Sequence, residues 1–334
     1  LARESIAKAI GANNDEIIFT SGATESDNLA LLGVMEKNKE KGNHLITCVT
    51  EHKAILDTAK HLESLGYDVT YLPVDEYGLI DLEKLKSAIT EKTVLISIMF
   101  ANNEIGTIQN VSEIGAIAHE HNVLFHTDAA QAVGHIPIDV KKMNIDLMSF
   151  SSHKIYGPKG IGALYLRSLM PRVKLNSIVH GGGQERNIRS GTLNVPGIVG
   201  FAKAVEIAVA EMNDENKKYK KWTDSMLEVF SKVGGKLNGH PTNRLLHNLN
   251  IGFEGIESKA IINSVSKKIA ISAGSACTTQ NVEPSHVLLS LGLSEDQSHY
   301  AIRIGCGRFN TDEDIETATG EILNAVESLA KIRL

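Results

Sequence analysis

A lysine stands where a buried strand is expected to end. Residues 145–150 form an apolar, strand-like run, and Ser151, Ser152 and His153 separate this run from Lys154. Prolines and glycines follow at once and prevent a helix from starting there. A lysine amine in this position can form a Schiff base with a carbonyl group, although most lysines of this kind are ordinary surface-loop residues.

Small hydroxyl residues follow another strand-like run, at residues 16–20. The segment 21–26 reads Ser-Gly-Ala-Thr-Glu-Ser and opens a predicted helix. Free backbone N–H groups and the helix dipole at such a start bind anions such as phosphate. A plain helix cap by Thr24 or Ser26 explains the same residues equally well, so this segment alone does not separate the two.

Three further polar residues lie at predicted strand ends: His52, Asn103 and Asp128. A carboxylate at the end of a buried strand is costly unless a cation or a hydrogen-bond donor pairs with it, and a protonated heterocyclic nitrogen would suit Asp128. His52 could stack on a flat ligand, and Asn103 could donate a hydrogen bond to one. Helix caps, a core histidine and a turn asparagine are the structural alternatives for these positions.

The predicted elements would bring these residues together. Continuous apolar runs alternate with amphipathic segments, which predicts an α/β fold with a mostly parallel sheet covered on both faces. Ligands of such sheets bind at the carboxyl ends of the strands. The later strands are predicted at residues 44–50, 68–74, 94–99, 123–126 and 145–150, with 160–166 as a further strand that is a candidate for an antiparallel one.

Taken together, the strand-end residues match the parts of a pyridoxal 5′-phosphate (PLP) site. The anion site would hold the phosphate, Asp128 would keep the pyridine ring an electron sink, and Lys154 would supply the amine. Each motif is weak alone, and their occurrence on successive strands of one sheet makes the prediction much stronger.

Length and charge set wider limits. With 334 residues, the chain is long enough for a large domain and a smaller one, predicted at residues 1–210 and 211–334. The net charge of −6 gives no reason to expect nucleic acid or a membrane as a partner, and no apolar run approaches the roughly 20 residues that span a bilayer.

The basic and aromatic helix 211–222 could bind nucleic acid, but a solvated helix that links two domains explains it better. Leu1 falls inside a helical pattern, so we expect the chain to begin partway through a longer sequence.

The three cysteines, Cys48, Cys277 and Cys306, lie far apart. Their spacing favours neither a disulfide framework nor a metal site, and it fits a reducing compartment, here taken as the cytoplasm. Cys48 and Cys306 occur in apolar runs and are predicted to be core residues. Cys277 occurs in a polar loop, where an exposed thiol has no packing role.

The chain also carries a series of longer motifs: TSGATESDNLA, TEHKAILDT, ANNEIG, HTDAAQAVG, SHKIYGPKGIGALY, GGGQERNIRSGT, SAGSACTTQNVEPSHVL and IRIGCGRFNT. Together they resemble the cysteine desulfurases, in the branch that serves Fe–S cluster assembly and tRNA thiolation. The resemblance covers essentially the whole chain, and an N-terminal segment of the family would precede Leu1. It implies the fold-type I aminotransferase architecture, with a large PLP domain and a small C-terminal α/β domain, in a homodimer.

The resemblance also implies a role for each residue of the cofactor site. Lys154 would hold PLP covalently and later move the Cα proton of the substrate, while Asp128 would pair with the pyridine nitrogen. His52 would stack on the ring and assist catalysis, and Gln131 would bond the ring hydroxyl. The phosphate would be bound by Thr24, Ser151 and His153, with Thr192 reaching it from the partner subunit.

For the substrate, the resemblance implies that Asn103 and Arg303 hold the carboxylate of L-cysteine, Arg303 through a bidentate pair. Cys277 would be the nucleophile, so that L-cysteine becomes L-alanine and a persulfide forms on Cys277. The sulfur would then pass to an acceptor protein, either an Fe–S scaffold or a tRNA-thiolation relay. A selenocysteine lyase and a non-catalytic sulfur-relay scaffold are the alternatives that the sequence leaves open.

Overall fold

The chain folds into two compact units. The computed structural model describes residues 1–169, 172–273 and 283–332. Two short segments of the N-terminal half belong to unit 2, and one of them carries Asn103. The sequence did not predict that these segments would join the smaller unit. Unit 1 comprises Leu1–Pro73, Ile80–Asn102 and Gln109–Met212, and unit 2 comprises Val74–Leu79, Asn103–Ile108 and Asn213–Leu334.

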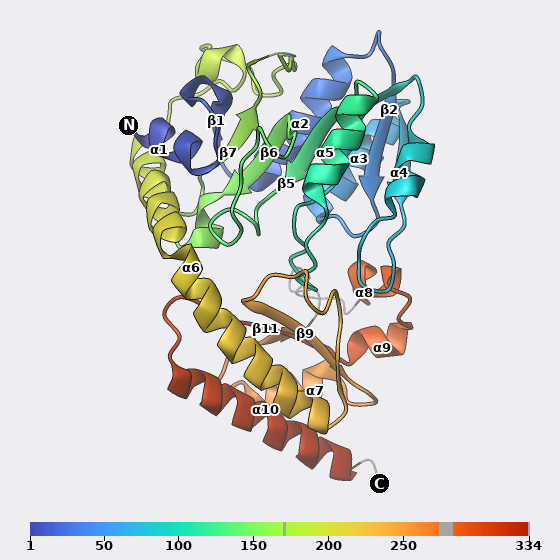
Figure 1. Ribbon diagram of the computed structural model, residues 1–334, viewed down its shortest axis with the longest axis vertical. Helices are drawn as coiled ribbons and strands as arrows, with labels where there is room; N and C mark the ends of the chain where they lie inside the picture. Colours follow the sequence, from blue (N-terminus) through green and yellow to red (C-terminus); the bar gives the residue numbers. More distant parts are fainter. Residues whose placement is uncertain (170–171, 274–282, 333–334) are drawn as a thin grey trace. The chain divides into compact units, whose positions relative to one another are not determined.

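Within the described residues, unit 1 is built on a seven-stranded sheet with the strand order β1-β7-β6-β5-β4-β2-β3 (Figure 1). β7 runs antiparallel to its neighbours β1 and β6, and the other neighbouring strands are parallel. The predicted α/β fold with a mostly parallel sheet is therefore confirmed, as is the antiparallel direction of the last strand. The strands are β1 (Ile17–Thr20), β2 (His44–Cys48), β3 (Asp68–Leu72), β4 (Thr93–Ser97), β5 (Leu124–Asp128), β6 (Leu147–Ser151) and β7 (Gly162–Leu166).

Helices bury this sheet, which explains the apolar composition of its strands. Every residue of β2, β4, β6 and β7 is buried, as expected where both faces are covered. α2 packs on β4, β6 and β7 and beside α3, and α5 packs on β5. In Figure 1, α5 lies in front of the sheet and α2 behind it. The helices and short 3-10 turns are α1 (Ala2–Ala9), η1 (Asn14–Glu16), α2 (Ala23–Lys37), α3 (Lys53–Ser64), α4 (Leu82–Ala88), α5 (Val111–Glu120), η2 (Ser152–Ile155) and η3 (Glu185–Asn187).

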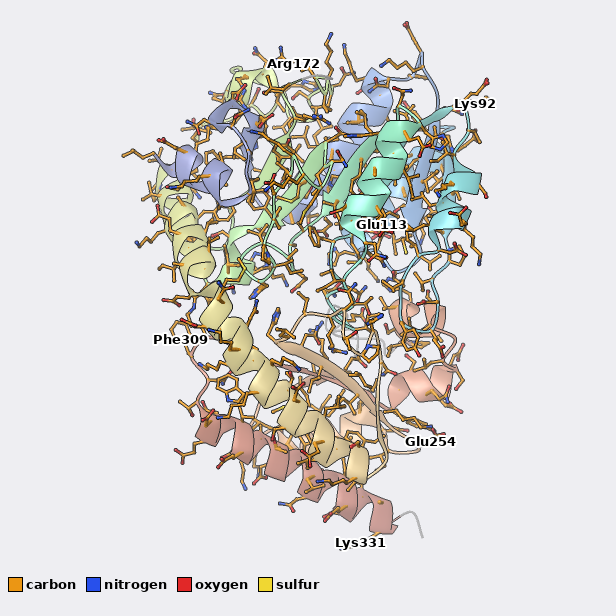
Figure 2. The ribbon with its side chains drawn as sticks, viewed as in Figure 1. Lys92, Glu113, Arg172, Glu254, Phe309 and Lys331 are labelled. Carbon is orange, nitrogen blue, oxygen red and sulfur yellow. The ribbon has the colours of Figure 1, made fainter. Side chains whose placement is uncertain are left out.

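Unit 2 has its own antiparallel sheet, with the strand order β10-β11-β9-β8 among the described residues. Its core combines aliphatic residues of β9, β11 and α10 with aromatic residues of α6, a helix that begins in unit 1 and ends in unit 2. Phe309, labelled in Figure 2, follows β11 and is 78% exposed. The elements are α6 (Val195–Lys232), β8 (Gly235–Leu237), β9 (Asn248–Phe253), α7 (Ser258–Val265), β10 (Ser272–Ala273), α8 (His286–Ser290), α9 (Glu295–His299), β11 (Ala301–Gly305) and α10 (Asp312–Ile332).

The charged segment 211–222 lies inside α6 and is buried on one face. Tyr219 and Trp222 are 0% and 3% exposed and belong to the core of unit 2, while Lys220 and Lys221 face the solvent. The aromatic residues of this segment therefore serve packing, and only its charged face is solvated. In the described part of the chain, no helix combines the length and the apolar composition that crossing a membrane requires.

Candidate active site

Lys154 lies in η2, the short turn that follows β6 directly. The turn ends at Tyr156, whose φ of 65° is left-handed, so the chain cannot continue as a helix. Ile155 is buried and anchors the turn, whereas Lys154 itself is exposed. The backbone thus fixes the base of the lysine and leaves its amine accessible.

Asp128 ends β5, next to β6 in the sheet, and is 6% exposed. Its Oδ1 accepts a hydrogen bond of 2.9 Å from the backbone N–H of Ala130. Burial raises the pKa of this carboxyl, while the Ala130 N–H and the charges of His52 and Lys154 lower it. The structure therefore brings together the acid, the histidine and the lysine that the sequence selected.

His52 is the N-cap residue of α3, and its Nδ1 accepts a hydrogen bond of 3.1 Å from the backbone N–H of Ala54. The capping role that the sequence left open is thus real. An accepting Nδ1 places the proton of the neutral ring on Nε2. Because the ring also acts electrostatically on Asp128, the cap holds it next to that carboxylate rather than removing it from the site.

The start of α2 has no side-chain cap. Its N-cap residue is Gly22, which has no side chain to cap the first turn. The Gly22 N–H donates to the Thr20 hydroxyl at 3.4 Å, and the Ser21 N–H donates to the Glu25 carboxylate at 2.8 Å. Ser26 is instead buried and bonds to the Thr20 hydroxyl at 2.8 Å. A helix cap by Thr24 or Ser26 is therefore wrong, and the first turn, with the exposed Thr24, keeps the character of an anion site.

Ser151 and His153 belong to the same corner of unit 1. A Cβ atom placed on Gly22 would lie 3.8 Å from the Ser151 hydroxyl, which shows how close the start of α2 comes to the end of β6. Ser151 Oγ and His153 Nδ1 are 2.8 Å apart. Burial, together with the charges of Lys154 and Lys159, lowers the pKa of His153. Hydroxyls, backbone N–H groups and cationic neighbours thus converge where the sequence predicted a phosphate.

Asn103 and Arg303 lie together in unit 2. The Arg303 guanidinium donates a hydrogen bond of 3.1 Å to the backbone carbonyl of Asn103, and the Asn248 amide donates one of 3.2 Å to the same oxygen. Arg303 sits in β11 opposite Asn250 of β9, so a strand pair fixes its backbone. The two residues predicted for the substrate carboxylate are therefore neighbours.

Glu104 is a member of this group that the sequence did not reveal. It is 5% exposed, and its carboxylate accepts a hydrogen bond from the Ser285 hydroxyl. Burial raises its pKa, and Ser285, His286 and Arg303 lower it. Arg303 is thus close enough to a carboxylate to interact with it, although no acidic residue lies near it in the sequence.

For Gln131 and Thr192, the structure gives the position in the fold and the burial but no contact with the other site residues. Gln131 is partly buried in the turn after β5, and Thr192 is exposed. Cys277 lies outside the described residues. Cys48 and Cys306 are buried and free, which confirms them as core residues, and burial raises the pKa of their thiols to about 12 and about 11.

Comparison with known proteins places the chain in a family. The family model described as aminotransferase class-V matches residues 1–317. The cysteine desulfurase IscS of Methanosarcina thermophila is 50% identical over 331 residues, which cover 98% of this chain and 81% of that protein. The cysteine desulfurase IscS of Ehrlichia chaffeensis is 50% identical over 334 residues, or 99% of this chain and 81% of that protein.

Solved structures agree with this placement. A NifS-like protein superposes with a TM-score of 0.91 at 39% identity, covering 98% of this chain and 87% of its own. SspA in complex with cysteine superposes with a TM-score of 0.80 at 41% identity, covering 93% and 86%. The chain belongs to the aminotransferase class-V family, in its cysteine desulfurase branch, so the resemblance inferred from the motifs is confirmed.

The cofactor of this family is PLP, and the chain has residues that fit it. The described residues give the carboxylate of Asp128 one hydrogen bond, from a backbone N–H, and no side-chain donor. A buried carboxylate left in this state favours a cationic partner, which a protonated pyridine nitrogen supplies. The uncapped start of α2 beside Ser151 fits a phosphate. The predicted cofactor is therefore confirmed, whereas the role of each side chain stays a proposal.

Proposed function

We propose that this protein converts L-cysteine to L-alanine, transfers the sulfur to Cys277 and passes it on to an acceptor protein. The observation that carries the site assignment is the position of Asp128, a buried carboxylate with Lys154 and His52 beside it at the end of the parallel strands. PLP, when bound, supplies the electron sink that activates the substrate. Asp128 would hold the pyridine nitrogen protonated, with His52 against the ring and Gln131 on its hydroxyl.

The phosphate would be held by the start of α2. Thr24, Ser151 and His153 would donate to its oxygens, and Thr192 of the partner subunit would complete the site in a homodimer. Lys154 would bind the cofactor covalently and move the Cα proton of the substrate, because its amine is free to swing from an anchored turn.

The substrate carboxylate would lie on Arg303 and Asn103. In sulfur transfer, the Cys277 thiolate would attack the substrate sulfur, so that an S–S bond forms and the Cβ–S bond breaks. The electron pair of the broken bond stays on carbon, and protonation then gives the methyl group of L-alanine. The acceptor would be an Fe–S scaffold protein or a tRNA-thiolation relay. We place the reaction in the cytoplasm because the spacing of the three cysteines fits a reducing compartment.

Borohydride reduction followed by peptide mapping tests the site assignment. The purified protein should absorb visible light, and reduction should leave the cofactor on Lys154. The variant Lys154→Ala should lose the linkage, whereas Lys159→Ala, five residues further along the same loop, should keep it. Cofactor found on Lys159, or on no lysine, would contradict the assignment.

A further inference from the structure

A group of buried titratable side chains lies beside Asp128 and has no part in the chemistry above. Asp27 of α2, Glu51 in the turn after β2 and His126 of β5 are each 0% exposed. Burying an ionised carboxylate is strongly unfavourable unless it is well paired. The positions of the protons in this group therefore decide how much negative charge surrounds Asp128.

His126 cannot supply a positive charge. Its Nδ1 lies 2.8 Å from the Ser97 hydroxyl, and its Nε2 lies 2.9 Å from the Ser149 hydroxyl and 3.7 Å from Asp27 Oδ1. Burial lowers the pKa of this imidazole to about 3, so the ring is neutral at physiological pH. Asp27 consequently faces an uncharged ring and not an imidazolium.

Asp27 and Asp128 differ in what surrounds their carboxyl groups. In the described structure, neither side-chain oxygen of Asp27 makes a hydrogen bond of good geometry, although the Ser149 hydroxyl lies near the carboxyl. Asp128 accepts a hydrogen bond from the backbone N–H of Ala130 and has the charges of His52 and Lys154 nearby. Burial raises the pKa of Asp27 well above its usual range, the charges of Asp128 and Glu51 raise it further, and the Ser149 hydroxyl opposes this. Of the two aspartates, Asp27 is the one to which the fold gives less support for a negative charge.

We propose that Asp27 keeps its proton at neutral pH and acts as an uncharged positioning residue beside Asp128. Two like charges in a desolvated group repel strongly, and the proton goes to the carboxyl whose negative charge is less well supported by donors and cations. Asp128 then remains the aspartate that carries negative charge toward the ring nitrogen. For its functional meaning this inference rests on the proposed role of Asp128, but the proton on Asp27 is measurable without it.

The proton on Asp27 makes the stability of the protein depend on pH. An unfolded aspartate has a pKa of about 3.9, and burial raises the folded value. The stabilising effect of the bound proton is complete below pH 3.9 or so and is lost as the pH rises toward the folded pKa. Over that window, one retained proton raises the unfolding equilibrium constant about tenfold per pH unit.

Infrared spectroscopy tests the proton directly. The full chain with bound cofactor, labelled with ¹³C in the aspartate carboxyl groups, should show a label-shifted carboxylic-acid band at pH 7. Asp27→Asn should remove that band. Because only aspartate is labelled, the band of Asp27 is distinguished from any band of Glu51. The variant Asp128→Asn should keep the Asp27 band, whether or not Asp128 contacts the cofactor. Absence of the band from the labelled wild-type protein, or its persistence in Asp27→Asn, would overturn the proposal.

Equilibrium unfolding in urea supplies a second readout. Relative to Asp27→Asn, the unfolding constant of the wild type should rise about 100-fold between pH 5 and pH 7, because asparagine binds no proton. The matched control is Asp57→Asn, the same substitution at an exposed position of α3, for which the ratio should stay constant. A constant ratio for Asp27→Asn as well would show that Asp27 is ionised and would reject the proposal.

Discussion

At the scale of single residues, the residues with proposed roles fall into two groups. Residues proposed to hold the cofactor lie in unit 1, whereas Asn103 and Arg303, proposed for the substrate carboxylate, lie in unit 2. Arg303 is held by the strand pair of β11 and β9 and by its bond to the Asn103 carbonyl. A residue held in this way should affect substrate affinity without disturbing the cofactor.

Arg303→Ala should therefore weaken the binding of L-cysteine. Loss of one partner of a buried, hydrogen-bonded charge pair costs about 2–5 kcal/mol, so KM should rise at least about 30-fold. The visible spectrum of the cofactor should not change. Arg308→Ala is the matched control, because Arg308 pairs with Glu215 and anchors α6; it should lower stability and leave KM nearly unchanged. An unaltered KM in Arg303→Ala would reject its role.

The cysteines give a second test at this scale. An ordinary thiol with a pKa of about 8.5 is ionised to a few per cent at neutral pH, whereas burial raises the pKa of Cys48 to about 12 and that of Cys306 to about 11. Neither buried thiol is thus available as a nucleophile. Cys277→Ser should bind L-cysteine and yet release almost no alanine or sulfide, while Cys48→Ser and Cys306→Ser keep most activity. Mass spectrometry should find the persulfide on Cys277; finding it on either of the other two would contradict the assignment.

At the scale of elements, the proposed phosphate site at the start of α2 depends on the close approach of β7 to that helix. A Cβ atom at Gly162 would lie 2.6 Å from Gly22 Cα and 2.7 Å from the Phe150 carbonyl oxygen, and both are backbone atoms that cannot turn away. Only glycine fits this position without moving the start of α2. The corner is thus built by backbone contact as much as by side chains.

Gly162→Ala should therefore destabilise the protein and weaken PLP binding. Overpacking of this kind typically costs about 1–3 kcal/mol, and the displaced α2 should lower cofactor affinity about tenfold or more. Gly320→Ala is the control, because Gly320 lies in α10 with open space around it; there the same change should stabilise by about 0.5–1 kcal/mol. Thermal unfolding and cofactor titration of both variants measure these effects, and equal shifts in both would refute the steric explanation.

The residues that the sequence identified are those at the ends of strands. Asp128 and Lys154 were predictable because each lies within a few residues of the end of an apolar run, and a parallel sheet places such ends at one edge. Asp27 and His126 were not, because one is a helix residue and the other stands inside a strand. They meet only because α2 packs across the sheet. Likewise, Glu104 lies far from Arg303 in sequence, and a chain excursion into unit 2 brings them together.

At the scale of the whole molecule, each unit has a hydrophobic core of its own. The core of unit 1 includes buried side chains of α2, β2 and β4 together with Phe125 and Phe150, whereas that of unit 2 includes Tyr219, Trp222 and Phe230 of α6. The chain contains one tryptophan, Trp222. Its fluorescence therefore reports the unfolding of the core of unit 2. The residues proposed to bind the cofactor all lie in unit 1.

This separation predicts that the cofactor stabilises the two cores unequally. A ligand at 100 times its Kd stabilises the fold that binds it by about 2.7 kcal/mol, and the proposed PLP contacts of this chain lie in unit 1. In urea, saturating PLP should raise the midpoint of the far-ultraviolet circular dichroism change, to which unit 1 contributes the larger sheet, more than the midpoint of Trp222 fluorescence. The variant Trp222→Phe should abolish the fluorescence transition and preserve the circular dichroism transition. Coincident midpoints that move together with PLP would show instead that the two cores unfold as one cooperative unit.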